Sequence, residues 1–123
     1  RERGQERAEA SVVTPAVAIY YAVFQLYGHE APRRMYEILE PLMVARLSGE
    51  GNGAELLFHP VQAQLLDRQL AVVEAILRAE PRICGVPFFV QLFCSKTKRL
   101  SAIASRRCAS MLSEVCRRVG GGG

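Results

Sequence analysis

The residues whose chemistry could matter most are four cysteines in the last third of the chain: Cys84, Cys94, Cys108 and Cys116. Cysteines can form disulfides, bind zinc, or pack as small apolar residues when they stay reduced. The sequence has no CxxC motif and no histidine at ligand spacing from a cysteine, so zinc is the weakest interpretation. We favour reduced, buried thiols, and a disulfide-linked helical hairpin is the alternative.

The spacing of the first two cysteines is similar to that of the twin CX9C proteins of the mitochondrial intermembrane space, because nine residues separate Cys84 from Cys94. The resemblance implies two disulfides in a helical hairpin, Cys84–Cys116 and Cys94–Cys108. The second spacing departs from the pattern, because only seven residues separate Cys108 from Cys116. Helical positions eight apart differ by about 80° in direction, so these two sulfur atoms would not share one seam.

The remaining candidates for catalysis are isolated from one another. His29 and His59 have no nucleophile near them in the sequence, and Glu37 and Glu40 lack an accompanying Glu-x-x-His motif. The glycine-rich stretch 49–53 lacks the lysine and the preceding strand of a phosphate-binding loop. The sequence therefore predicts a protein that is not an enzyme, with no catalytic residue, metal site, cofactor or small-molecule substrate.

Positive charge is concentrated in the last third of the chain. Residues 1–85 carry nine Lys/Arg and eleven Asp/Glu, a net charge of −2, whereas residues 86–123 carry seven Lys/Arg and one Glu, a net charge of +6. The predicted basic surface consists of Lys96, Lys98, Arg99, Arg106 and Arg107. It is either a solvated turn or a docking site for an acidic protein surface, an RNA backbone or anionic lipid.

Proline and glycine residues divide the chain into segments with apolar residues at helical spacing. No alternation of period two is long enough for a strand. The predicted helices run from Pro15 to Gly28, from Pro32 with a kink or break after Glu40, from Pro60 to Ala79, from Val86 to Ser95, and from Arg99 to Val119. Loops are predicted at 48–52 and 95–98. The sequence therefore predicts an all-α fold of about five helices.

Residues 1–123 are predicted to form a single helical domain, with a charged N-terminal extension over 1–13 and a flexible glycine tail over 120–123. The uncharged stretch 11–28 predicts a helix that is buried on nearly every side, and a short membrane span is the alternative. The acidic residues of the extension argue against a signal or transit peptide. The predicted location is intracellular, cytoplasmic or nuclear, with a mitochondrial location as the alternative.

A short apolar helix, a basic turn and a longer helix rich in small residues follow one another over residues 85–116. The short helix carries the pattern Gly85, Val86, Pro87, Phe89, Val90, Leu92 and Phe93, and the longer helix carries Ala104, Ala109, Leu112 and Val115. The unit resembles an armadillo repeat. The long helices predicted from Pro15, Pro60 and Arg99 start about 40–45 residues apart, in the range of HEAT and armadillo units.

The resemblance implies a short armadillo/HEAT-like stack of about two and a half repeats over residues 15–119. A closed four- or five-helix bundle is the alternative fold. One departure concerns function, because peptide-binding armadillo proteins display an asparagine ladder, whereas the equivalent place here is near Glu114. Recognition of extended basic peptides is therefore not implied.

The predicted function is a non-enzymatic protein–protein interaction module or scaffold, because stacked helix pairs are usually binding surfaces. Its polar face is predicted to carry one row from each long helix: Asp67, Arg68 and Glu74, and Arg106 and Glu114. The alternative is a structural subunit of a large assembly, such as a mitochondrial ribosome or a respiratory complex. There the basic C-terminal third would contact RNA or anionic lipid.

Overall fold

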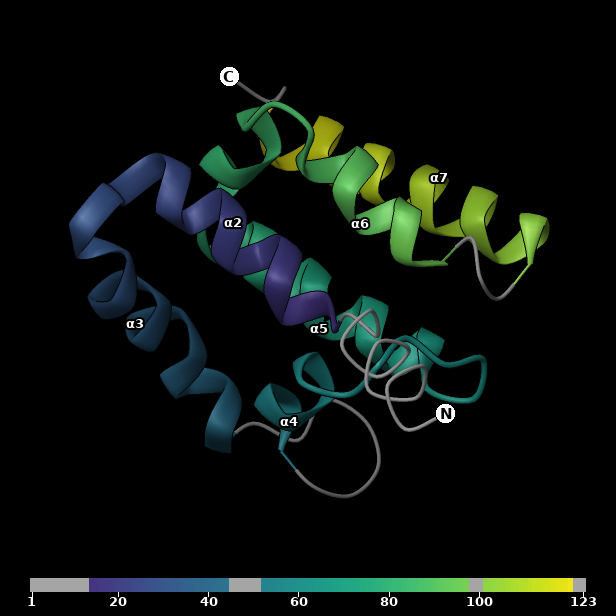
Figure 1. Cartoon of the computed structure of the whole chain (residues 1–123), viewed down its shortest axis with the longest axis horizontal. Coiled ribbons are helices and arrows are strands. Elements are labelled where there is room, and N and C mark those ends of the chain that lie inside the picture. The colour runs from purple at the N-terminus through teal and green to yellow at the C-terminus, as the bar shows by residue number, and fades with distance from the viewer. Residues whose placement is uncertain (1–13, 45–51, 98–100, 121–123) are drawn as a thin grey trace, which may run out of the picture.

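The computed structural model describes residues 14–44, 52–97 and 101–120, and Figure 1 shows their arrangement. The helices are α2 (Pro15–Tyr27), α3 (Ala31–Val44), α4 (Gly53–Leu57), α5 (Leu66–Ala79), α6 (Phe89–Thr97) and α7 (Ala102–Gly120), with the 3-10 helices η1 (Gly28–Glu30) and η2 (Pro81–Gly85). No strand occurs in these ranges. The prediction of an all-α fold of about five helices is confirmed. The predicted extension 1–13 and most of the glycine tail lie outside the described residues, whereas Gly120 ends α7.

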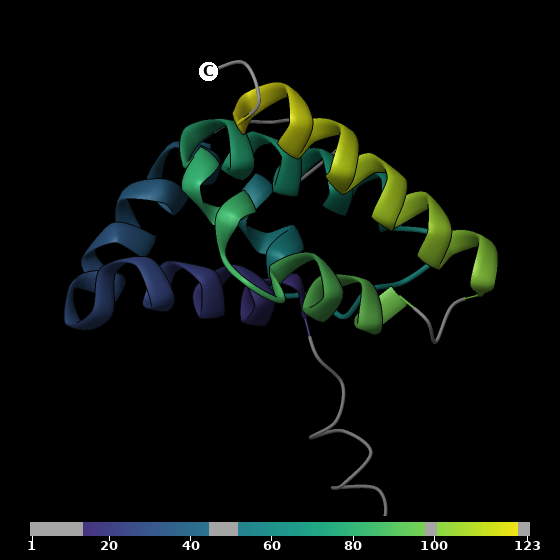
Figure 2. The ribbon, with the colours of Figure 1, turned by 90° about the horizontal axis from the view of Figure 1, so that it is seen from above.

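The helices form two layers that η2 ties together. Figure 2 shows α2 and α6 in one layer and α5 and α7 in the other, while α3 lies at one end, and α4 contacts α3 and α5. Neighbours within each layer contact one another, α6 packs on α7 between the layers, and η2 contacts α2, α5, α6 and α7. The core is built from the buried aliphatic and aromatic side chains between the layers, including Ile19, Leu77, Ile83, Phe89 and Leu112. This arrangement places α5 and α7 side by side with one common face outward.

α2 begins and ends where the sequence predicts. Pro15 occupies the first turn after an extended Thr14, and Gly28 ends the helix with a left-handed φ of 59°. One face of α2 is fully buried, but Val17, Tyr20 and Phe24 on the opposite face are 49%, 41% and 52% exposed. The expectation that nearly every side is buried is therefore wrong for this row. No helix in the described part of the chain is long and apolar enough to cross a membrane.

α3 continues through Pro41 to Val44, so of the kink or break predicted after Glu40 the break does not occur. Pro41 lacks a backbone donor, which costs about 3 kcal/mol in a helix interior. The helix nevertheless buries one apolar stripe on both sides of the proline, with Met35 and Ile38 before it and Leu42 after it. Burial of such side chains contributes about 1.5–3 kcal/mol each, which offsets the missing hydrogen bond.

The segment before α5 differs most from the prediction, because α5 begins at Leu66 instead of Pro60. The short helix α4, which the sequence analysis missed, precedes it and is capped by Asn52, whose Oδ1 accepts from the backbone N–H of Glu55 at 2.9 Å. Gln69 explains the turn between α4 and α5. Its side chain is fully buried, and its Nε2 donates to the carbonyl oxygens of Leu56 and His59 at 3.1 Å each.

Replacing Gln69 with leucine should lower the free energy of unfolding by about 1–3 kcal/mol, because buried carbonyl oxygens lose their donor. Urea denaturation of the purified variant measures this loss. Gln64→Leu is the matched control, since Gln64 is exposed in the same turn, and its change should stay within about 0.5 kcal/mol. Equal stability of the two variants would contradict the role given to Gln69.

The last two helices are shifted slightly from their predicted starts. Phe88 has a left-handed φ of 71°, which a helix cannot include, so α6 begins at Phe89 instead of Val86. α7 begins at Ala102, where the hydroxyl of Ser101 accepts from the backbone N–H of Ala104 at 3.0 Å. Three members of its predicted apolar stripe are buried: Cys108, Leu112 and Val115.

Candidate functional site

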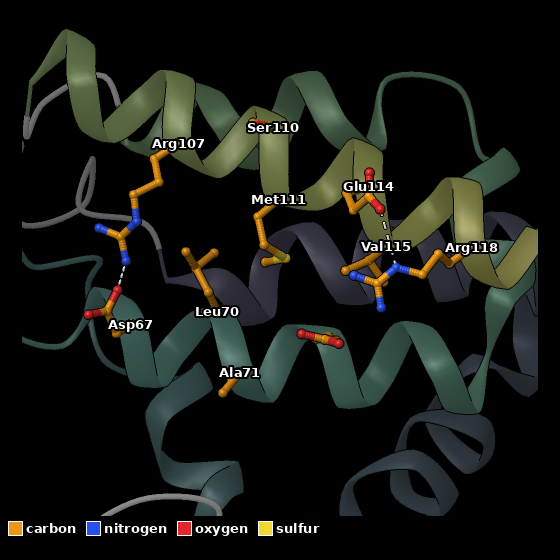
Figure 3. A pocket seen from close by; sticks show the side chains of 10 residues that line it. Asp67, Leu70, Ala71, Arg107, Ser110, Met111, Glu114, Val115 and Arg118 are labelled. Carbon is orange, nitrogen blue, oxygen red and sulfur yellow. Dashed lines mark hydrogen bonds and ion pairs between the residues drawn. The ribbon is translucent and has the colours of Figure 1, made fainter.

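A groove of about 590 Å³ runs between α5 and α7 on the outer side of their layer (Figure 3). We call it the α5–α7 groove and define it by its lining residues: Asp67, Leu70, Ala71, Glu74, Arg107, Ser110, Met111, Glu114, Val115 and Arg118. The two helices advance in the same direction along it, since Asp67 faces Arg107 at one end while Glu114 and Arg118 lie toward the other. Equivalent positions on the two helices are therefore 40 residues apart, as in Asp67 and Arg107.

The floor of the α5–α7 groove is apolar. Leu70 and Val115 are 5% and 2% exposed and belong to the core, while Met111 is half-buried between them. Ala71 and Ser110 are exposed and small, so the rim leaves the floor open. An apolar floor below a polar rim is the usual construction of a surface that binds another molecule.

The rim of the groove carries charges of both signs, which form ion pairs with one another. Arg107 forms an ion pair with Asp67 across one end of the groove. Glu114 accepts from Arg117 at 2.6 Å and from Arg118 at 3.3 Å. The hydrogen bond from Arg117 is the main cause that lowers the pKa of Glu114, and the charge of Arg117 and the contact with Arg118 add to it. The rim is thus an arrangement of fixed ion pairs and has no single-sign field.

The structure brings four of the predicted binding residues together in this groove: Asp67, Glu74, Arg107 and Glu114. Arg106, which was predicted to share the row of Glu114, is exposed but does not line the groove. Adjacent helical positions point about 100° apart, so Arg107 takes the place instead. Arg68 is half-buried outside the groove lining. Lys96 belongs to α6, while Lys98 and Arg99 lie outside the described residues.

Sequence reasoning missed the remaining lining residues of α7. Met111 was not named as a binding residue, and Arg118 was counted only as part of the basic third of the chain. The signal for both was the helical spacing, because positions 107, 111, 114 and 118 follow one another by three or four residues and so share one face. Of the predicted basic surface, Arg107 is paired with a carboxylate, and the nearby Arg117 and Arg118 are paired with Glu114.

A disulfide joins Cys84 of η2 to Cys116 of α7, with a Cα–Cα distance of 5.6 Å. The favoured prediction that all four cysteines are reduced is therefore wrong. Cys94 and Cys108 are buried thiols, so the second pair implied by the CX9C resemblance is not formed. Burial is the main cause that raises the pKa of the Cys108 thiol, and a hydrogen bond with Thr97 and the charge of Arg107 act against it. The outer pair forms because η2 lies against α7.

A second polar cluster, absent from the sequence analysis, links three elements around the buried carboxylate of Glu80. Glu80 is 4% exposed, and its Oε1 accepts from the hydroxyl of Tyr27 at 2.6 Å and from the guanidinium of Arg34 at 2.7 and 2.9 Å. Arg34 and Arg82 also lie over the Tyr27 ring, 5.7 and 5.6 Å from its centre. We call these four residues the Glu80 cluster.

The Glu80 cluster is built to hold a carboxylate in its charged form. Burial is the largest single influence and raises the pKa of Glu80, but the hydrogen bonds from Tyr27 and Arg34 and the charges of Arg34 and Arg82 together outweigh it and hold the pKa below its ordinary value. The same pairing raises the pKa of Arg34. Tyr27 and Arg34 bind Glu80 directly and Arg82 lies over Tyr27, so the cluster serves to join α2 and α3 to the corner after α5.

The other candidates for chemistry are scattered. His29 is exposed beside Glu30, Glu37 pairs with Arg34 at 3.2 Å, and His59 is exposed in the turn after α4. Within the described ranges, no three His, Cys, Asp or Glu residues are grouped so that they could hold a metal ion. Compared with models of protein families, with curated proteins and with solved structures, the chain matches none of them.

Proposed function

We propose that this protein is a non-enzymatic interaction module whose α5–α7 groove receives an amphipathic helix of a partner protein. One observation carries the proposal: the groove of about 590 Å³ between two parallel helices has an apolar floor that lies open between charged rims. A third helix can lay one apolar ridge on such a floor, which is a common mode of peptide recognition. The fixed ion pairs at the rim would then select the charges that flank the ridge.

The parallel arrangement of α5 and α7 supports a short armadillo/HEAT-like stack. Helices of stacked repeats lie beside their counterparts at a constant sequence spacing, and α5 and α7 have a spacing of 40 residues. α7 packs on α6 of the other layer, and α5 packs on α4. The proposal is therefore a scaffold of helix pairs in which the groove between equivalent helices is the binding surface.

The pairing of the rim charges favours a protein partner over nucleic acid. An RNA backbone would have to take Arg107, Arg117 and Arg118 away from the carboxylates that they contact. A phosphate partner also makes affinity fall steeply with salt, by about 10³–10⁵ between 50 and 200 mM for six to ten contacts. A protein partner with an apolar ridge should show a much flatter salt response.

The second candidate function, a structural subunit of a large assembly, is supported by the exposed apolar row of α2. Val17 and Tyr20 line a depression of about 450 Å³ with Phe58, which is 57% exposed. In an assembly this face would be covered by a neighbour, and the basic C-terminal third would contact RNA or anionic lipid. Sedimentation of the purified chain separates the two functions, because a module stays monomeric whereas an isolated subunit self-associates.

The disulfide bears on the compartment. Disulfides persist in oxidising compartments and are rare in the cytosol and nucleus. Cys84–Cys116 therefore argues against the predicted cytoplasmic and nuclear locations, and of the predicted locations it leaves the mitochondrial one.

Blocking the α5–α7 groove should abolish binding of a helical peptide selected from a random library on the intact chain. Ala71→Arg and Ser110→Arg each place a long side chain over the floor, and each should weaken affinity at least about tenfold. Ser113→Arg is the matched control, because Ser113 is exposed on α7 but does not line the groove. Calorimetry measures the three affinities. Equal loss in all three variants, or no loss in any, would contradict the proposal.

A further inference from the structure

The Cys84–Cys116 disulfide lies at one end of the α5–α7 groove. Cys116 lies between groove residues Val115 and Arg118, and Cys84 belongs to η2, which follows α5 after Glu80 and contacts both α5 and α7. The opposite end of the groove is crossed by the ion pair of Asp67 and Arg107. The two helices that form the groove are therefore joined twice, covalently at one end and by an ion pair at the other.

The two links differ greatly in strength. The side chains of Asp67 and Arg107 are 80% and 52% exposed, and ion pairs between exposed groups contribute about 0–1 kcal/mol. The disulfide fixes the end of α7 against η2 regardless of salt or pH. Beyond Val115, α7 has no fully buried side chain in its described residues, because Arg117, Arg118 and Gly120 are exposed and Val119 is half-buried. Apart from the half-buried Val119, which packs against the core, the disulfide is the main attachment of this last turn.

The four cysteines also differ in access. Cys84 and Cys116 are half-buried, and are therefore more accessible to a reductant than Cys94 and Cys108, which are 9% and 0% exposed within the core. Attack on a disulfide requires a thiolate, and burial keeps the Cys108 thiol protonated by raising its pKa. Reduction and reoxidation of the outer pair can thus proceed without exchange into the inner thiols.

We propose that the Cys84–Cys116 disulfide is a redox-controlled clamp on the α5–α7 groove, closed by oxidation and opened by a dithiol reductant. A thiolate of the dithiol attacks one sulfur, breaks the S–S bond and releases the other cysteine as a thiolate, which takes up a proton. The second thiol of the reductant then displaces the remaining cysteine from the mixed disulfide. Two electrons and two protons pass to the protein, and the reductant leaves as its disulfide.

The consequence of opening is local. The disulfide end of the groove, with Glu114 and Arg118, loses its covalent attachment to η2, whereas α5 keeps its buried contacts through Leu70, Val73 and Leu77. The end of α7 would then be mobile on one side of the groove. A partner helix would have to order it on binding, and this entropic cost lowers the affinity. The effect on a partner rests on the proposed function, but the loosening of α7 does not.

Hydrogen exchange of the intact chain, measured by mass spectrometry with and without dithiothreitol, tests the clamp. On reduction, amides of residues 112–120 should exchange at least about tenfold faster, with a smaller change across α5. Cys84→Ser/Cys116→Ser should reproduce the reduced pattern without reductant, and circular dichroism should show that its helices are retained. Cys94→Ala, which leaves the disulfide intact, should keep the oxidised pattern. Unchanged exchange in α7, or an equal rise in α5 and α7, would overturn the clamp.

Peptide binding to the oxidised and to the reduced chain distinguishes failure of the clamp from failure of the proposed function. The library-selected helical peptide should bind the oxidised chain about tenfold more tightly than the reduced chain. Equal affinity would overturn control of binding by the disulfide. If exchange in α7 responds to reduction but no peptide depends on Ala71 and Ser110, the proposed function fails while the clamp on α7 stands.

Discussion

Reduction of the Cys84–Cys116 disulfide is expected to lower the free energy of unfolding by about 3–4 kcal/mol. The sequence separation of the two cysteines is 32 residues, and a cross-link over a loop of this length removes conformational entropy from the unfolded chain. For a chain of this size, the loss corresponds to a fall of about 12–16 °C in the melting temperature. Thermal unfolding followed by circular dichroism, with and without dithiothreitol, measures it.

The control for this experiment is the double variant Cys84→Ser/Cys116→Ser, which should melt at the temperature of the reduced protein in either buffer. Both sites are half-buried, so the serine hydroxyls have access to water and add little penalty of their own. Any further shift of this variant in dithiothreitol would point to Cys94 or Cys108 instead. If the melting temperature of the wild type were the same with and without the reductant, the disulfide would not contribute to the stability of the folded protein.

The disulfide also shows what the sequence could and could not predict. The spacing of Cys108 and Cys116 on one helix argued against a hairpin with two disulfides, and indeed only one disulfide is present. That argument compared positions along α7 alone. The pairing of Cys116 is decided by which element lies against it, and the contact of η2 with α7 joins segments about thirty residues apart. Local periodicity contains no information about such a contact.

Helix boundaries were predictable where the determinants are local. Pro15 and Gly28 limit α2, and the apolar stripe through Leu112 identifies α7. Prediction failed where a distant group intervenes. Gln69 holds the turn before α5 by binding backbone carbonyl groups up to 13 residues away, so Pro60 does not start a helix. Burial of Leu42 stabilises the continuation of α3 past Pro41, although the proline alone favours a break.

The sequence predicted only part of the groove lining, because the polar face of each helix is a local feature whereas the packing of one helix on the other is not. Asp67, Glu74 and Glu114 were identified because each lies on the polar face of a strongly amphipathic helix. Arg106 and Arg107 were both predicted as binding residues, and only Arg107 lines the groove, because one position is a rotation of about 100°. Which part of a polar face meets its neighbour depends on how two helices are rotated against each other, and that rotation is set by the packing of the whole core.

The Glu80 cluster had no local signal at all, and its removal is the second large effect that we expect. Glu80→Gln should lower the free energy of unfolding at pH 7 by about 2 kcal/mol. Removal of one partner from a buried ion pair costs about 3–5 kcal/mol, because the other charge stays buried. The cost is lower here, since the Arg34 side chain is 26% exposed and also pairs with Glu37.

The pH dependence of this loss distinguishes an ionised Glu80 from a neutral one. The cluster lowers the pKa of Glu80 in the folded protein, so the charged carboxylate stabilises the fold at pH values above its ordinary pKa in the unfolded chain, and this stabilisation is lost as the pH falls through the folded pKa. The difference between wild type and Glu80→Gln should therefore be constant near neutral pH and shrink in acid. Urea denaturation at several pH values measures it.

Glu74→Gln is the matched control for this test, because Glu74 lies on α5, which ends just before Glu80, and pairs with Arg78 at 2.6 Å in a largely exposed ion pair. An exposed i, i+4 pair contributes about 0.3–0.5 kcal/mol, so this variant should be nearly as stable as wild type. If the two variants lost equal stability, or if the loss in Glu80→Gln grew as the pH fell, the carboxylate of Glu80 would not be the charged centre that joins α2 and α3 to the end of α5.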